Sequence, residues 1–225
     1  MIPWRLLDCA QVPGHDAELR LYRRGTEFSI RVDGSELMNS GVHGSEDALA
    51  ELACARISGR SRVLTGGRGM GYTLAAALKR LGAGSQVVVA ELVPAVVEWN
   101  RGHLAPLAGN PLEDKRVTVQ EIDVARILRA EHRTFDAILL DVDNGPQGLT
   151  LKGNSWLYAL PGLEAAFGAL RPGGVLAIWS VGPNRSFTQR LRRVGFVVNE
   201  LRVRARGLHG GRPHTIWIAS RTLGA

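Results

Sequence analysis

The chain has 225 residues, of which 45% are hydrophobic and 22% charged, a composition that excludes a disordered chain, a coiled coil and a collagen-like fibre. This length suits one ordinary domain with room for a small additional unit. The formal net charge is +7, and all but three of the 28 basic residues are arginines. Net charge bears on association and solubility rather than on fold. Whether the arginines indicate a binding partner therefore depends on where they lie in the sequence.

The sequence contains no membrane signal and no cysteine framework. No apolar run approaches the ~18 residues that a membrane span needs, and residues 1–5 lack the hydrophobic core of a signal peptide. The two cysteines, Cys9 and Cys54, have neither metal-ligand spacing nor the number that a disulfide framework requires. We therefore expect a cytoplasmic protein with reduced cysteines and no membrane partner.

The first 44 residues predict a small N-terminal β-hairpin unit. Apolar residues alternate with polar ones over residues 18–38, with a turn at Arg24-Gly25-Thr26 and a second turn at Asp33-Gly34. Ser45 then fits the N-cap of a helix that Gly59 ends. A second, larger domain is expected over residues 45–225.

The larger domain alternates short apolar runs with helical stretches of ten or more residues. The strand candidates are residues 62–65, 86–90, 117–122, 135–140 and 175–179. Repeated strand and helix units predict a parallel sheet covered on both faces. The alternating residues 197–203, a turn-rich stretch and residues 215–219 predict a terminal antiparallel hairpin. The expected fold is therefore α/β, with a mostly parallel seven-stranded sheet.

A glycine-rich string follows the first strand of this sheet: Gly66-Gly67-Arg68-Gly69-Met70-Gly71. It opens a helix predicted from Tyr72 to Leu81, whose first turn has free backbone N–H groups. Glycine allows the backbone to approach a ligand closely. Glycines also make tight turns without any ligand. The interpretation of this string as a ligand-binding loop therefore depends on the acids at the ends of the neighbouring strands.

Two such acids follow the second and third strands. Glu91 lies 20 residues beyond Gly71 and is placed to accept hydrogen bonds from both hydroxyls of a ribose, or else is a solvated carboxylate at a strand end. Asp123 is placed to accept a hydrogen bond from an adenine amino group, or to cap the helix that begins at Val124. These two roles of Asp123 are compatible.

The fourth strand is apolar and ends in Asp141-Val142-Asp143. Ligands of open α/β sheets bind beyond the carboxyl ends of the strands, and two acids at the end of a buried strand are a poor arrangement for stability alone. The following residues also suit a simple turn. We assign the turn to Gly145 and Pro146, and take Asp141 and Asp143 as candidate catalytic residues.

These segments together resemble the spermidine synthase family, within the class I S-adenosylmethionine-dependent methyltransferase fold. The resemblance covers residues 18–220 and rests on residues 63–67, the strands before Glu91, Asp123 and Asp141, the Asp33-Gly34 turn, Arg171-Pro172-Gly173-Gly174 and Trp179-Ser180. It implies a Rossmann-like nucleoside-binding domain over residues 45–225, a homodimer, and S-adenosylmethionine or its decarboxylated form as co-substrate.

The resemblance also implies a role for each matching residue. The methionine and ribose portion would lie along Gly66, Gly67, Gly69 and Gly71. Glu91 would hold the ribose, Asp123 the adenine, and Asp141 would face the reacting centre.

On the acceptor side the sequence departs from the family. Glu36-Leu37-Met38 stands where a glutamine follows the Asp-Gly turn, and Ala48-Leu49-Ala50 stands where the family has a Tyr-His-Glu triplet. The second acid after the fourth strand also comes one residue early, as Asp143. Methyl and aminopropyl transfer to a small acceptor, such as an amine or a polyamine, both stay open.

Either transfer displaces a thioether from a carbon next to a sulfonium, which requires an in-line, deprotonated nucleophile. An aliphatic amine has a pKa near ~10.4, so a nearby carboxylate serves to accept the released proton. We assign this role to Asp141, with Asp143 or Asn144 as a second contact. No metal is expected, because a hard cation needs more oxygen ligands and residues 179–184 contain no acid.

Two other functions stay open: a non-catalytic nucleoside-binding or sensor protein without the polyamine site, and a nucleic-acid methyltransferase. The second would use the basic segment at residues 185–225, which contains nine arginines and a single acid, Glu200. These arginines fall partly on the polar face of an alternating strand. We interpret them as a solvated or partner-facing edge, and expect no nucleic-acid partner.

Overall fold

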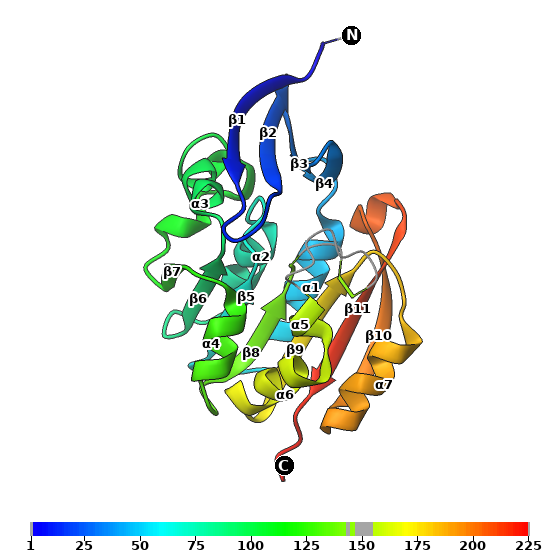
Figure 1. Cartoon of the computed structure of the whole chain (residues 1–225). Helices are drawn as coiled ribbons and strands as arrows, with labels where there is room; N and C mark the ends of the chain where they lie inside the picture. The colour runs from blue at the N-terminus through cyan, green and yellow to red at the C-terminus, as the bar shows by residue number, and fades with distance from the viewer. Residues whose placement is uncertain (1, 143–144, 147–154, 225) are drawn as a thin grey trace.

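The computed structural model describes residues 2–142, 145–146 and 155–224. It contains a four-stranded sheet in the order β1-β2-β3-β4 and a seven-stranded sheet in the order β10-β11-β9-β8-β5-β6-β7. The small sheet lies at the N-terminal end of the molecule, above the large one (Figure 1). The predicted α/β class and the mostly parallel seven-stranded sheet are confirmed.

The N-terminal unit is a four-stranded antiparallel sheet, larger than the predicted hairpin. Its strands are β1 (Arg5–Gln11), β2 (Glu18–Arg24), β3 (Glu27–Val32) and β4 (Ser35–Asn39). The alternation of buried and exposed residues that marks β2 is absent from β1, most of whose residues are exposed. The period-two pattern on which a strand prediction depends is therefore missing there.

The turn between β3 and β4 agrees with its sequence signal. Asp33 and Gly34 both have positive φ, 48° and 82°, as the two central residues of a type I′ hairpin turn require. Val32 and Ser35 are paired across it. The Asp33-Gly34 pair thus sets the register of β4 against β3.

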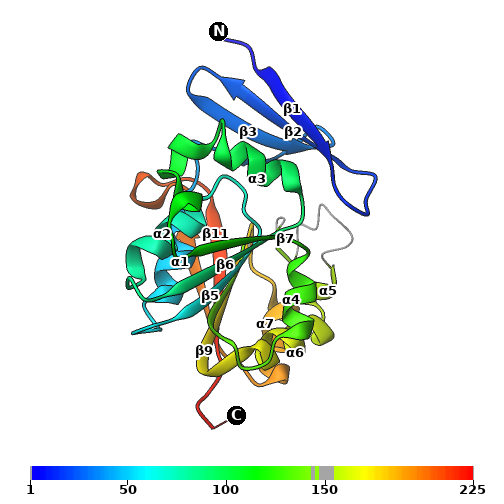
Figure 2. The same cartoon turned by 90° about the vertical axis from the view of Figure 1, so that its left-hand side faces the viewer.

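One face of the N-terminal sheet packs on α3 (Pro94–Arg101). Leu21, Ile30 and Trp99 share a buried apolar cluster, and the Trp99 indole Nε1 donates a 2.7 Å hydrogen bond to Asp8 Oδ2. Figure 2 shows α3 directly beneath the strands. The small sheet is thereby held against the helix that follows β6.

The large sheet has five parallel strands and a terminal antiparallel pair. The parallel strands are β5 (Arg62–Gly66), β6 (Gln86–Glu91), β7 (Val117–Glu121), β8 (Phe135–Leu140) and β9 (Leu170–Ser180). The pair is β10 (Val197–Arg204) and β11 (Pro213–Ser220). Strand β11 lies between β9 and β10, so β10 forms the edge. The predicted strands match within two residues at each end, except that β9 begins five residues earlier.

Helices cover both faces of this sheet (Figure 2). Helices α1 (Gly44–Cys54) and α2 (Tyr72–Arg80) bury apolar residues against one face. The other face packs on α4 (Val124–Ala130), α5 (Ser155–Tyr158), α6 (Leu160–Ala169) and α7 (Arg185–Val194). Three short 3-10 helices complete the described elements: Ala105–Ala108, Pro111–Glu113 and Gly207–His209. Within the described part of the chain, no helix combines the length and apolarity of a membrane span.

The start of α1 corrects one prediction. The N-cap is His43, which makes no capping hydrogen bond through its side chain, and Ser45 lies inside the first turn. Gly44 allows the helix to begin here, because a Cβ atom at Gly44 would lie 2.3 Å from the backbone N of Gly207. The helix also ends at Cys54, before the predicted stop at Gly59. A contact distant in sequence therefore fixes the beginning of α1.

Candidate functional site

A pocket lies between the N-terminal sheet and the carboxyl ends of the parallel strands. One wall is apolar and comes from the N-terminal unit: Val12, Leu19, Ile30, Val32, Leu37 and Met38. The other walls follow the ends of strands β5 to β8 and the first turn of α1, and their polar members are Glu46, Arg68, Glu91, Asp123 and Asp141. Segments from both sheets thus form a single site.

The glycine-rich loop divides into residues that line the pocket and residues that shape the loop. Gly67 and Gly69 line the pocket, with positive φ of 83° and 49°. Gly66 ends β5, where a Cβ atom would lie 2.9 Å from the Leu140 side chain, and Gly71 caps α2 with a φ of 90°. Neither Gly66 nor Gly71 is among the pocket residues. Internal packing therefore explains these two glycines.

Gly67 is required by a close approach between two strand ends. A Cβ atom there would lie 2.4 Å from the carbonyl oxygen of Asp141, and the Asp141 N–H donates to the Gly66 carbonyl at 3.0 Å. The loop after β5 and the end of β8 are thus in direct backbone contact, which brings Asp141 to the glycine-rich loop.

Glu91 is buried, with 7% of its surface exposed, so its interpretation as a solvated carboxylate is wrong. Its Oε2 accepts a 2.8 Å hydrogen bond from the Arg68 backbone N–H, and its Oε1 accepts a 2.9 Å bond from the Val93 N–H. Burial raises the pKa of Glu91, against the effect of these N–H donors. Through these two bonds Glu91 ties the glycine-rich loop to the end of β6. Because each carboxylate oxygen can accept more than one hydrogen bond, Glu91 can still accept hydrogen bonds from a ligand.

Asp123 lines the pocket and also caps α4. Its Oδ1 accepts a 2.8 Å hydrogen bond from the Ala125 N–H. Of the two interpretations drawn from the sequence, capping is therefore observed. The residue is only half-buried at the pocket wall, which leaves the adenine contact open.

Asp141 is half-buried in the pocket, and its side-chain partner in the described structure is Thr73 in the first turn of α2. The Thr73 hydroxyl donates a 2.8 Å hydrogen bond to Asp141 Oδ2. Burial raises the pKa of Asp141 to about 6, against the effect of this hydrogen bond. The second predicted catalytic acid, Asp143, lies outside the described residues.

The sequence interpretation missed Glu46, a second buried acid in the same pocket. It is 6% exposed, and burial together with the negative charge of Asp141 raises its pKa to about 8. In the sequence, Glu46 follows the pattern of an ordinary first-turn acid, which favours a helix N-terminus. Its burial depends on the first turn of α1 lying beside the ends of the parallel strands, for which the sequence carries no local signal.

Glu46 is connected to a histidine of β11. The Ser45 hydroxyl donates a 2.6 Å hydrogen bond to Glu46 Oε2, and Ser45 Oγ lies 2.9 Å from His214 Nδ1. The His214 ring packs edge-on against Trp179, with 4.8 Å between ring centroids, and burial lowers its pKa. A chain of hydrogen-bonding groups therefore leads from the pocket to His214 on β11.

The described residues contain no group of three or more histidine, cysteine or acidic side chains arranged to hold a metal ion. The acids of the pocket lie at the ends of their strands and at the start of α1, where the charge of Asp141 acts on Glu46. The chemistry that they support is hydrogen bonding and proton transfer.

The sheet order and the pocket at the carboxyl ends define a class I S-adenosylmethionine-dependent methyltransferase-like fold. Solved spermidine synthases share it. A spermidine synthase in complex with the transition state analogue AdoDATO has a TM-score of 0.76 at 18% identity, covering 97% of this chain and 73% of that chain. The spermidine synthase from Thermotoga maritima has a TM-score of 0.77 at 17% identity, with the same coverage.

A probable spermidine synthase from Corynebacterium glutamicum ATCC 13032 has a TM-score of 0.66 at 14% identity and covers 96% of this chain and 79% of that chain. No protein-family model and no curated protein sequence matches the chain. The predicted resemblance to spermidine synthases is confirmed for the fold. Identities of 14–18% establish a shared fold and not a shared activity.

Proposed function

We propose that the protein is a transferase that binds an S-adenosylmethionine-type donor and moves an alkyl group from its sulfonium to a small amine. One observation carries this proposal: the half-buried Asp141 and the buried Glu46 share a pocket with Glu91 and the glycine-rich loop, at the carboxyl ends of the parallel strands. The likeness to a spermidine synthase that binds a transition state analogue supports it.

The donor nucleoside would lie along the loop and the two neighbouring strand ends. Gly67 and Gly69 line the pocket, and their backbone would contact the sugar and the amino-acid portion. Glu91 would accept hydrogen bonds from the ribose hydroxyls, and Asp123 one from the adenine amino group while it continues to cap α4. Gly66 and Gly71 would contribute indirectly, by shaping the loop.

In the proposed reaction the amine nitrogen forms a bond to the carbon on sulfur, and the carbon–sulfur bond breaks so that the thioether leaves with the electron pair. The nitrogen then loses one proton, which Asp141 accepts. A carboxylate with a raised pKa is a better proton acceptor than an ordinary one. Glu46 holds its own proton near neutral pH, because its pKa is raised to about 8, so the pair carries about one negative charge.

The walls of the pocket indicate the kind of acceptor. The N-terminal sheet contributes only apolar side chains to it, and a multiply charged polyamine needs several acids along its length. A small amine with an apolar portion fits one acidic centre and an apolar wall. We therefore favour such an acceptor over a long polyamine.

Replacement of Asp141 by asparagine tests the role of this acid. With a panel of small amines, we expect D141N to lower kcat by roughly 100- to 10,000-fold, the usual contribution of a general base, while donor binding persists. Product release from a labelled donor measures kcat. The control is E164Q, because Glu164 is exposed on α6 and is not among the residues that line the pocket.

Unchanged turnover in D141N would show that Asp141 is not the base. Donor binding without turnover of any acceptor would favour the non-catalytic binding protein. Failure to bind any adenosyl compound would refute the proposed function as a whole.

A further inference from the structure

The glycine-rich loop contains a buried arginine, Arg68, whose guanidinium has no hydrogen-bonding partner among the described residues. Arg68 is only 5% exposed. Within the described part of the chain, none of its three guanidinium nitrogens finds an acceptor. Leaving a charged donor buried and unpaired costs several times the net contribution of an ordinary hydrogen bond. Because Arg68 also lines the pocket, its missing acceptor points to a ligand.

The surroundings of Arg68 add positive potential. Its guanidinium lies against Gly71, where a Cβ atom would be 2.4 Å from Nη1. Gly71 is the N-cap of α2, whose own first turn contains no acid. Asp141 of the neighbouring strand end accepts a hydrogen bond from Thr73 in this turn, so the helix end already has one acidic partner at Thr73 and a positive side chain at Gly71. The N-terminus of a helix is the positive end of its dipole and attracts anions. The cation and the helix end therefore favour the same kind of ligand, a negatively charged one.

The nearest acid does not fill this role. Glu91 acts on the Arg68 guanidinium through its charge, but its oxygens accept hydrogen bonds from the backbone N–H groups of Arg68 and Val93. Burial lowers the pKa of Arg68 to about 10, so the guanidinium is still charged at neutral pH. An anion with two acceptor oxygens would match its planar fork.

We propose that Arg68 binds the α-carboxylate of the donor, so that the pocket selects intact S-adenosylmethionine over its decarboxylated form. This inference rests on the proposed function, since it assumes an adenosyl sulfonium in the pocket. A carboxylate is the one anionic group by which the two donors differ. Aminopropyl transfer, which needs the decarboxylated donor, is then disfavoured for this chain despite its fold.

The affinities of three compounds for the wild-type protein test this inference. Isothermal titration calorimetry without acceptor compares S-adenosylmethionine, decarboxylated S-adenosylmethionine and methylthioadenosine, which lacks the amino-acid portion. We expect the intact donor to bind about tenfold or more tightly than the decarboxylated one, as for a charge-assisted pair.

Equal or tighter binding of the decarboxylated donor would overturn the inference and leave the proposed function standing. Binding of none of the three compounds would overturn both. A carboxylate supplied by the acceptor instead of the donor would also produce no preference between the two donors, and so would count against the inference.

Substitution of Arg68 locates the effect. We expect R68Q to bind the intact and the decarboxylated donor with about equal affinity, and to bind methylthioadenosine as the wild type does. We expect R68K to retain part of the preference for the intact donor. The matched control is R62Q, because Arg62 lies at the opposite end of β5, with its guanidinium 5.6 Å from the Phe135 ring centroid. R62Q is expected to keep the wild-type preference.

If R68Q lost affinity for all three compounds equally, Arg68 would act on the loop and not on the carboxylate, and the inference would fail. If R68Q did not fold, the inference would still be tested by the donor preference of the wild-type protein and of R68K.

Discussion

At the scale of single residues, Glu46 is the side chain whose behaviour depends most on its surroundings. Its ordinary pKa of 4.5 is raised to about 8, first by burial and then by the charge of Asp141. Between these two values the folded protein keeps a proton that the unfolded chain has released. The free energy of unfolding therefore decreases as the pH rises through this window.

We predict that Glu46→Gln removes this pH dependence, because glutamine cannot ionise. E46Q should gain stability over the wild type as the pH rises from 5 to 8, by at most about 1.4 kcal/mol per pH unit, the value for one proton. Urea unfolding at several pH values measures it. Parallel stability curves for the two proteins would show that Glu46 is not a buried acid with a raised pKa.

The control for this measurement is Glu51→Gln on the same helix. Glu51 is exposed and pairs with Arg80 at the surface, and exposed pairs of this kind contribute little. E51Q should follow the pH dependence of the wild type.

At the scale of structural elements, the site depends on the backbone contact between the loop after β5 and the end of β8. This contact requires the absence of a side chain at Gly67, which combines a left-handed φ of 83° with a Cβ position 2.4 Å from the Asp141 carbonyl oxygen. Loop and strand end cannot move apart without shifting Asp141. The glycine therefore connects the stability of the fold to the geometry of the pocket.

We predict that Gly67→Ala destabilises the protein by about 1–3 kcal/mol more than Gly109→Ala, and weakens donor binding as well. Gly109 is the matched control because it has a similar φ of 75° with no atom within 4 Å of a Cβ position. Urea unfolding and calorimetry measure the two effects. Equal destabilisation by both substitutions would mean that the end of β8 can shift at little cost to make room for a Cβ atom at residue 67.

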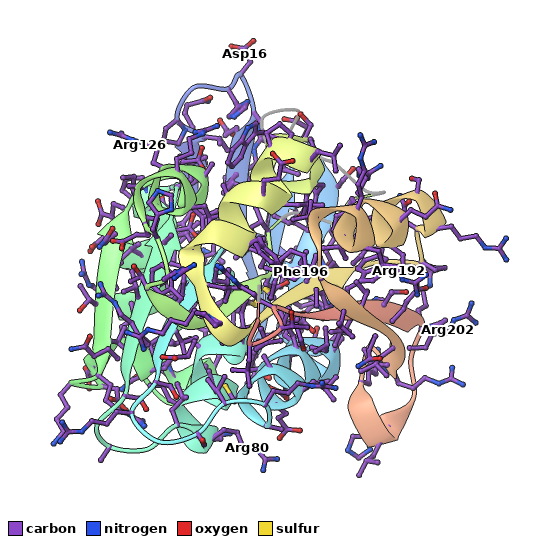
Figure 3. The ribbon with its side chains drawn as sticks, turned by 90° about the horizontal axis from the view of Figure 1, so that it is seen from below. Asp16, Arg80, Arg126, Arg192, Phe196 and Arg202 are labelled. Atoms are coloured by element: carbon purple, nitrogen blue, oxygen red, sulfur yellow. The ribbon has the colours of Figure 1, made fainter. Side chains whose placement is uncertain are left out.

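At the scale of the whole molecule, the positive charge is concentrated at one edge. Arg192 on α7 and Arg202 on the edge strand β10 are exposed and project outward on the same side (Figure 3). The pocket is lined by residues at the ends of β5, β6 and β8 and by Trp179 of β9, and β11 separates β9 from β10. The basic edge is thus distinct from the site.

We predict that this edge does not bind nucleic acid with functional affinity. Binding to DNA or RNA should be no tighter than about 1 µM at physiological salt, within the non-specific range, and R192Q/R202Q should leave donor binding unchanged. Fluorescence anisotropy over a salt titration measures this. Tight binding that weakens in the double variant would instead favour the nucleic-acid methyltransferase.

Local sequence patterns encode some features of this fold and not others. The strands of the large sheet were predictable because apolar runs of strand length alternate with helical stretches, and the acids Glu91, Asp123 and Asp141 were identifiable because each follows a strand directly. Strand β1 could not be found in this way, because most of its residues are exposed and no period-two pattern results.

The sequence alone thus determined the fold class, the large sheet and the acids at the ends of three strands, because these depend on short-range periodicity. The tertiary structure decided which polar groups lose contact with water. Glu46 is buried where the first turn of α1 meets the ends of the parallel strands. Among the described residues the Arg68 guanidinium finds no hydrogen-bond acceptor, although the charge of Glu91 acts on it. Burial and pairing depend on contacts between residues far apart in the chain, and no local pattern records them.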